Sequence, residues 1–296
     1  MLVLYDGWQN DTCRTDLVCV GHPDVALGDV RWGLCGVTEL VAFAPGFAPS
    51  VLTDCPHRSD GTQCDGAEPL KMESPVEVSV AVWVVAPGDS LDEETTVASH
   101  ELEHANGAFQ RSGAGIVLTY DVTGVSAQDK AKVDAIGNGC GQAAAMREHT
   151  DVYHRGAINV YYVKTLDHVT LDIGGSCWPN RDVVYAARDA KRPALLAHEI
   201  GHSLGLVTPD LKDGHIDQLP EYGDSAGRPE FRDNLMNSRV ETVENVWLGQ
   251  IYRIHFDTLS WFYSPVPSDR RWRECQDSAS SASPCPPLTL RPQGWP

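Results

Sequence analysis

Three residues in the second half of this chain have the types and spacing needed to hold a metal ion. His198, Glu199 and His202 lie within the run of residues 195–206. On an α-helix, residues four apart share one face, so the two imidazoles can bind one metal ion while Glu199 projects beside them. Zinc held by three protein ligands keeps a fourth position for water, and a neighbouring carboxylate can take a proton from that water. The spacing therefore predicts a zinc site with Glu199 as general base.

A second His-Glu-x-x-His pattern occurs at residues 100–104, so the spacing alone does not identify the site. His100 and His104 fall largely off an apolar stripe at helical spacing and are surrounded by acidic residues. We expect this copy to lie on a solvated helix that begins with a capping box formed by Ser90 and Glu93. The residues around the later copy are apolar on nearly every side, which is typical of a buried helix.

Two further features accompany the later copy. Gly205 follows the predicted helix and would let the chain turn to deliver a third ligand, and Met236 lies in the run Asn-Leu-Met-Asn at residues 234–237. With these features the sequence resembles the metzincin metallopeptidases, and within them most closely the secreted pappalysin-like enzymes. The resemblance implies a zinc-dependent endopeptidase in which Met236 forms the floor beneath the metal rather than a ligand.

The third ligand departs from the metzincin pattern. The family places it three residues after the glycine, where this chain has Thr208, and a threonine hydroxyl is a poor zinc ligand. His215 and Asp210 are the two nearby substitutes. We favour His215 because imidazole is the commoner zinc donor, and Asp210 stays the alternative. If neither residue bound zinc, the chain would be a catalytically degenerate scaffold that acts as a binding module.

A tyrosine that helps stabilise the transition state in some metzincins has no counterpart here. The resemblance places it at position 238, which is Ser238. Tyr222 and Tyr252 are nearby in sequence, but simple packing is the preferred interpretation for both.

The order of predicted elements indicates an α/β (α+β) fold. A strictly alternating strand precedes a long helix, and further strands precede the metal-binding helix. The resemblance implies a metzincin-like twisted mixed sheet with a backing helix, an active-site helix and a small C-terminal subdomain after the glycine turn. It also implies an edge strand along which an extended peptide lies, expected near residues 177–185. The predicted strands are 76–84, 116–120, 157–163 and 183–185, and the predicted helices are 91–111, 195–204 and 243–256.

Composition divides the chain of 296 residues into three parts. Residues 1–74 hold five of the nine cysteines and are expected to form a small disulfide-stabilised module or a propeptide. Residues 75–263 are the expected metallopeptidase domain, and residues 264–296 a tail rich in proline and serine. Cys35 has a second interpretation as a thiolate that silences the zinc site, although a disulfide role is favoured.

Net charge and cysteine content limit which classes of molecule this protein binds and in which compartment it acts. A net charge of −18 argues against nucleic acid and anionic membranes and leaves a peptide or protein as the expected substrate. The cysteines indicate a secreted protein whose leader has been removed, with Cys140–Cys177 and Cys275–Cys285 as candidate disulfides. No apolar run is long enough to span a bilayer. Zinc is the expected cofactor, and calcium is an alternative role for the many acidic residues.

Overall fold

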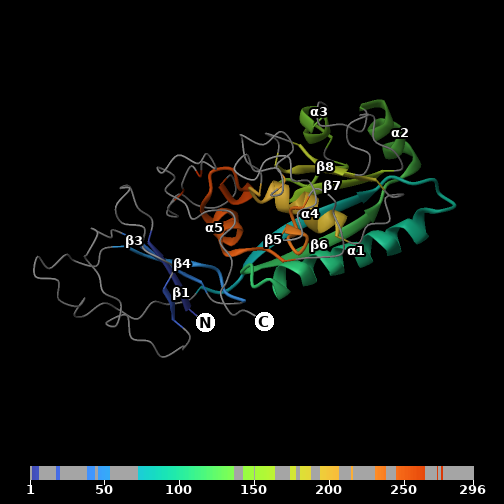
Figure 1. The fold of residues 1–296 in the computed structure, drawn as a ribbon. Coiled ribbons are helices and arrows are strands. Elements are labelled where there is room, and N and C mark those ends of the chain that lie inside the picture. The colour runs from blue at the N-terminus through green and yellow to red at the C-terminus, as the bar shows by residue number, and fades with distance from the viewer. Residues whose placement is uncertain are drawn as a thin grey trace, which may run out of the picture.

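A five-stranded mixed sheet with helices on both faces forms the larger part of the molecule (Figure 1). The computed structural model describes residues 2–6, 18–20, 39–43, 46–53, 73–136, 143–149, 151–163, 174–177, 181–187, 194–206, 215, 231–237, 245–263, 272 and 275. Four strands of the sheet are parallel, and the fifth, at one edge, is antiparallel. The strands are, in their order across the sheet, β6 (Ile116–Gly124), β5 (Val76–Val84), β7 (Ile158–Val163), β9 (Val183–Ala187) and β8 (Gly174–Ser176).

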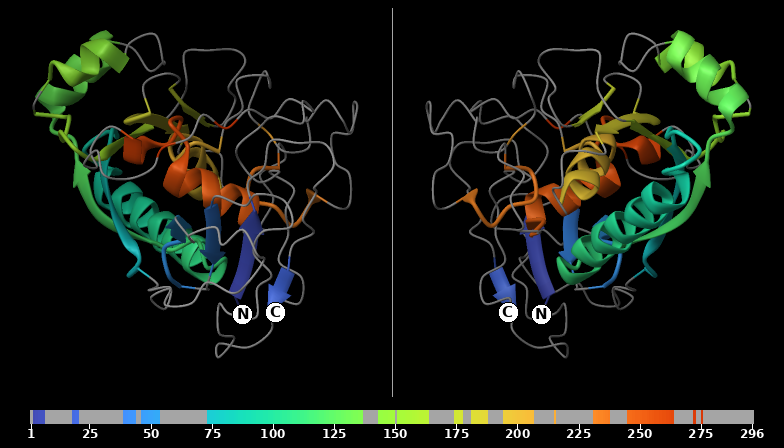
Figure 2. Two further views of the ribbon diagram at one scale, coloured as in Figure 1. Left: turned by 90° about the vertical axis from the view of Figure 1, so that its left-hand side faces the viewer. Right: turned by 90° about the vertical axis from the view of Figure 1, so that its right-hand side faces the viewer.

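Alternation along the strands divides the apolar residues between two cores. Val78, Val80, Val82 and Val84 of β5 point into the core that also contains the helices α1 (Leu91–Arg111), α4 (Leu195–Ser203) and α5 (Leu248–Phe256). Trp83 points to the opposite face, where α2 (Ala127–Ile136) and α3 (Ala143–Arg147) cover the sheet. Figure 2 shows α1 and α2 on opposite sides of the strands. The alternation at residues 76–84 therefore predicted both the strand and its two faces.

The start of α1 differs from the sequence prediction. The helix spans Leu91–Arg111, as predicted, and Ser90 is its N-cap residue. The Ser90 side chain makes no capping hydrogen bond to the helix and instead donates to the carbonyl of Pro87 at 3.3 Å. The predicted capping box is therefore wrong, because the turn after β5 gives the hydroxyl a closer acceptor.

A smaller antiparallel sheet lies within residues 1–74. Its strands, in spatial order, are β2 (Val18–Val20), β1 (Leu2–Asp6), β3 (Glu39–Phe43) and β4 (Ser50–Thr53). The turn between β3 and β4 reaches the larger part of the molecule, because the Ala48 backbone donates to the carbonyl of Glu73 at 3.1 Å. The five cysteines predicted to stabilise this region include Cys35, which lies outside the described residues.

Two residues of the C-terminal segment 264–296 are described. Cys275 is buried in the core of the larger sheet, and Trp272 packs against that core. Cys275 is disulfide-bonded, and so is Cys177. Their predicted partners, Cys140 and Cys285, lie outside the described residues, so the two pairings stay predictions. Among the described residues, no helix is both long and apolar enough to cross a membrane.

Helix α4 ends in a turn that depends on glycine. Gly205 has a φ of +86°, and its backbone donates to the carbonyl of His202, while the Leu206 backbone donates to the carbonyl of Gly201. This pair of hydrogen bonds is a Schellman motif, which satisfies the last carbonyls of the helix. A Cβ at Gly205 would also lie 2.8 Å from the backbone nitrogen of Ser260. Both the backbone conformation and the close approach therefore require glycine.

We predict that Gly205→Ala destabilises the protein much more than Gly156→Ala does. Gly156 has a nearly identical φ of +85°, but no atom lies within 4 Å of a Cβ placed there. Alanine in this conformation costs roughly 1–2 kcal/mol by itself. At Gly205 the collision with the Ser260 backbone should raise the loss to about 3 kcal/mol or more. Urea unfolding of both variants measures the difference, and equal losses would show that the close approach at Gly205 has no energetic cost.

Candidate metal centre

Helix α4 presents two imidazoles from a fully buried environment. His198 and His202 are 1% and 7% exposed, because α4 lies between the sheet, α1 and the C-terminal segment that includes α5. The Nδ1 atom of His198 donates to the carbonyl of Leu235 at 2.7 Å, and Nδ1 of His202 donates to the carbonyl of Leu206 at 3.2 Å. These hydrogen bonds use the Nδ1 atom of each ring, which is how histidines that bind metal through Nε2 are commonly oriented.

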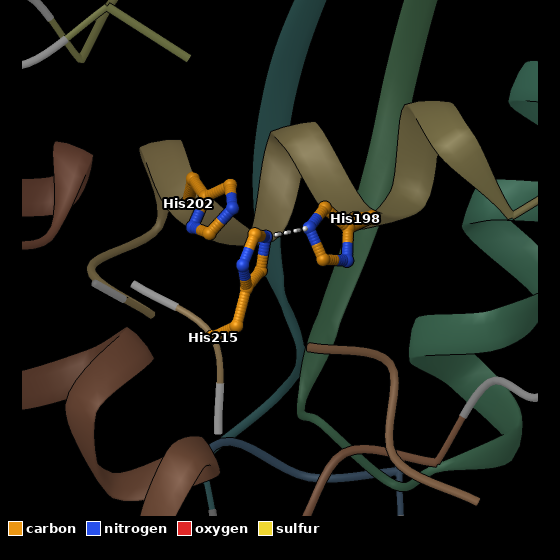
Figure 3. Close-up of side chains that lie close together, drawn as sticks. All are labelled: His198, His202 and His215. Atoms are coloured by element: carbon orange, nitrogen blue, oxygen red, sulfur yellow. Dashed lines mark hydrogen bonds between the residues drawn. The ribbon is translucent and has the colours of Figure 1, made fainter. Parts of the chain in front are cut away.

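His215 joins the two helical histidines from a different segment of the chain. Figure 3 shows the three rings gathered together, with His215 facing α4. The Nε2 atoms of His215 and His198 are 3.2 Å apart, and the candidate ligand atoms of all three residues lie within 4.8 Å of one another. The structure therefore brings together the three residues that the sequence suggested. Asp210, the alternative third ligand, lies outside the described residues, as does Thr208.

The donor set fits a zinc ion. Two nitrogens each about 2.0–2.1 Å from a tetrahedral ion would be about 3.3 Å apart, close to the separation of His198 and His215 Nε2. Burial, followed by the neighbouring His198 and His215, holds the pKa of His202 well below its usual value. Since the neutral imidazole is the form that binds metal, these three residues can hold a metal ion.

Glu199 lies next to these imidazoles and is also buried. Its side chain is 4% exposed, and burial raises its pKa to about 8, although a hydrogen bond from the Ser176 backbone N–H partly opposes this rise. Its Oε2 atom has no hydrogen-bond partner among the residues that the structure describes. A cation on the adjacent imidazoles would favour the ionised carboxylate. Glu199 therefore has one oxygen, Oε2, that is available for proton transfer.

Met236 lies directly beneath α4. Its side chain is 1% exposed, and its sulfur would be 2.7 Å from a Cβ placed on Gly201. Only glycine at position 201 lets the methionine approach the helix this closely. The same turn contains Leu235, whose carbonyl accepts the hydrogen bond from His198. The turn at residues 234–237 thus both underlies the helix and orients one imidazole.

Two buried amides that the sequence reasoning missed fix this turn. Asn234 and Gln250 exchange two side-chain hydrogen bonds of 2.8 and 2.9 Å. Asn234 Oδ1 also accepts from the Met236 backbone, and Gln250 Oε1 accepts from the Trp247 backbone. Gln250 could have indicated this pair from the sequence, because it is a polar residue within the mostly apolar predicted helix 243–256. A buried amide needs specific partners. The observed helix α5 begins five residues later than predicted, at Leu248.

The edge strand differs from its predicted position. We expected it near residues 177–185, but β9 (Val183–Ala187) lies inside the sheet, paired with β7 on one side and β8 on the other. The edge is β8, Gly174–Ser176, which ends just before the expected range. Two glycines in a three-residue strand produce no alternating pattern, so there was no hydrophobic period from which to identify it.

The second His-Glu-x-x-His copy lies on α1, where His100 is exposed and pairs with Glu103 at 3.5 Å. Among the described residues, neither His100 nor His104 belongs to a group of three candidate metal ligands. Glu101, however, is half-buried rather than exposed as we expected. It accepts a hydrogen bond from the Tyr162 hydroxyl at 3.2 Å, and burial raises its pKa to about 7, with a smaller contribution from Glu94.

One of the tyrosines considered for transition-state stabilisation is described. Tyr252 is 3% exposed and packs against Phe256 in α5, with 5.0 Å between ring centroids. This position agrees with the packing interpretation. Tyr222 and Ser238 lie outside the described residues.

Comparison with known proteins finds similar solved structures but no matching family. No family model matches the chain, and no curated protein matches it. The solved structures that resemble it include metalloproteinase-II from Bacteroides fragilis, with 15% identity and a TM-score of 0.37, over 61% of this chain and 52% of that one. The chain thus spans about half the length of that structure. So low a similarity carries no functional weight, and the function must be inferred from the side chains.

We predict that His215→Ala abolishes stoichiometric zinc binding. Removing one of three imidazoles leaves two donors, too few for a protein zinc site of the usual kind. His100→Ala is the matched control, because this exposed histidine lies on α1 and should leave the zinc content unchanged. Zinc content per chain after dialysis measures both variants. Zinc retained by His215→Ala but lost from Asp210→Ala would show that the third ligand is wrongly identified.

We predict that the ionisation of Glu101 destabilises the folded protein increasingly as pH rises, and that Glu101→Gln removes this loss of stability. A carboxyl whose pKa is raised in the folded state stabilises the fold below the unfolded pKa of about 4.5, and this stability is lost as pH rises towards 7. The variant should therefore gain stability relative to the parent between pH 5 and pH 8, by up to about 3 kcal/mol. Unfolding of the metal-free proteins at both pH values measures the gain. The exposed Glu103→Gln should show no such trend, and a pH-independent Glu101→Gln difference would contradict the assignment.

Proposed function

We propose that this protein is a zinc-dependent endopeptidase in which His198, His202 and His215 hold the metal and Glu199 is the general base. The observation that carries the proposal is the convergence of three imidazoles beside a buried carboxylate, with candidate ligand atoms within 4.8 Å of one another. When bound, zinc would supply a polarising centre for a carbonyl and a water of lowered pKa.

Glu199 would move the proton in this reaction. Its Oε2 atom, which has no partner in the described part of the chain, takes a proton from the attacking water as the oxygen adds to the peptide carbonyl carbon. The same carboxyl then gives that proton to the amine nitrogen as the carbon–nitrogen bond breaks. The products are one carboxylic acid and one amine, and Glu199 returns to its starting state. Burial at 4% exposure keeps bulk water from competing for the proton.

The substrate in this proposal is an extended peptide that pairs with the outer side of β8. An edge strand offers unpaired backbone groups to such a partner, and β8 lies at the edge of the sheet next to α4. Because a strand can extend past the site in both directions, the arrangement favours cleavage within a chain over removal of terminal residues.

We further propose that the protein acts outside the cell and that residues 1–74 form a module separate from the peptidase domain of residues 75–263. The disulfide bonds of Cys177 and Cys275 support an oxidising compartment. The antiparallel sheet β1–β4, which lies within residues 1–74, supports a separate module.

We predict that Glu199→Ala keeps about one zinc per chain but loses peptide cleavage. Loss of a general base lowers the rate by roughly 10²–10⁴-fold, while the three imidazoles stay in place. Digestion of a mixed peptide library, with zinc content measured on the same samples, gives both results. The exposed Glu103→Ala is the control for removing a carboxylate near a histidine. Cleavage by Glu199→Ala at the parental rate would refute the base, and absence of zinc from the parent would favour a binding scaffold.

A further inference from the structure

Two contacts join the active-site helix α4 to the edge strand β8. The hydroxyls of Ser203 and Ser176 are 2.8 Å apart, and the Ser176 backbone N–H donates to the Glu199 carboxylate. Ser203 and Glu199 lie one helical turn apart on α4, so both contacts come from the same helix face. The single residue Ser176 therefore contacts the proposed general base through its backbone and Ser203 through its side chain.

The pairing of β8 leaves the Ser176 backbone free for this role. The Cys177 backbone donates to the carbonyl of Val183 at 2.9 Å, which makes this pair hydrogen-bonded. In an antiparallel ladder hydrogen-bonded and non-hydrogen-bonded pairs alternate, so the Ser176–Val184 pair is of the second kind. The Ser176 N–H consequently points away from β9, toward the side where Glu199 accepts it.

Few interactions within the sheet hold strand β8 in place. It contains two glycines in three residues, and glycine loses more backbone freedom on folding than other residues. Its described ladder consists of three paired positions with β9. Cys177 anchors the strand at one end through its disulfide. The hydrogen bond between the Ser176 and Ser203 hydroxyls connects β8 to α4.

The burial of Ser203 supports a specific role for its hydroxyl. Ser203 is 0% exposed, and a buried hydroxyl costs free energy unless it has a partner. Serine is also a weaker helix former than alanine, so nothing in the helix itself favours it. The partner that the structure provides is Ser176 on the edge strand.

We propose that Ser203 and Ser176 are positioning residues that hold β8 against α4 so that the Ser176 N–H orients the Glu199 carboxylate. The proposal rests on the proposed peptidase function for its catalytic consequence. It also implies that β8 both pairs with the peptide and orients Glu199. A displacement of β8 would therefore disturb peptide binding and the general base together.

The tether itself is tested without any enzymatic activity. Hydrogen–deuterium exchange of the metal-free protein reports the protection of the Ser176 amide. Ser203→Ala should increase its exchange rate by about fivefold, because one hydrogen bond contributes about 1 kcal/mol. Ser112→Ala is the control, since it removes another buried hydroxyl, which bonds to the Ala108 carbonyl and the Val246 backbone rather than to β8. Unchanged exchange at Ser176 in Ser203→Ala would overturn the tether.

Steady-state peptide hydrolysis tests the catalytic consequence. Ser203→Ala and Ser176→Ala should each lower kcat by on the order of tenfold with KM within about twofold and zinc content unchanged, because a mispositioned base affects the transition state more than binding. The double variant should be no slower than either single variant, since both remove the same contact. Ser203→Thr, which keeps the hydroxyl, should recover most of the lost kcat.

The outcomes separate this inference from the proposed function. Parental kcat in Ser203→Ala, or additive losses in the double variant, would overturn the positioning role while leaving the peptidase intact. A parent that binds zinc but cleaves no peptide would refute the proposed function and the catalytic role of the serines together. The exchange experiment would still decide whether the two serines hold β8 to α4.

Discussion

The need to satisfy polar side chains on a buried helix governs the arrangement of this molecule. His198, Glu199 and His202 are 1%, 4% and 7% exposed, in a helix covered by the sheet and by other helices. Leaving such groups without partners would cost several kcal/mol in total. Each therefore has a backbone partner. His198 donates to the Leu235 carbonyl, Glu199 accepts from the Ser176 amide, and His202 donates to the Leu206 carbonyl.

Each of these partners depends on its own local structure. The Schellman turn at Gly205 directs the Leu206 carbonyl back at α4, and the Asn234–Gln250 amide pair fixes the turn that presents the Leu235 carbonyl. Strand β8 supplies the third partner. The convergence of the imidazoles in Figure 3 is thus the product of a turn, an amide pair and an edge strand that are far apart in sequence.

Those parts of the molecule that have a regular period or a strong motif could be predicted from the sequence. Alternation at residues 76–84 and the long helix Leu91–Arg111 are confirmed, because each buries one face repeatedly. Strand β8 could not be identified, since glycines carry no hydrophobic pattern. The partial burial of Glu101 was missed because its charged sequence neighbours indicated solvent, whereas its side chain bonds to Tyr162, 61 residues away. Tertiary contacts of this kind leave no local signal.

X-ray absorption at the zinc edge tests the central claim most directly, because it counts the donors around the metal. The full chain loaded with one equivalent of zinc should show three imidazole nitrogens at about 2.0–2.1 Å together with one oxygen. Three imidazoles would agree with the convergence of His198, His202 and His215. A shell with only two imidazoles, completed by additional oxygens or by a sulfur at about 2.3 Å, would contradict it.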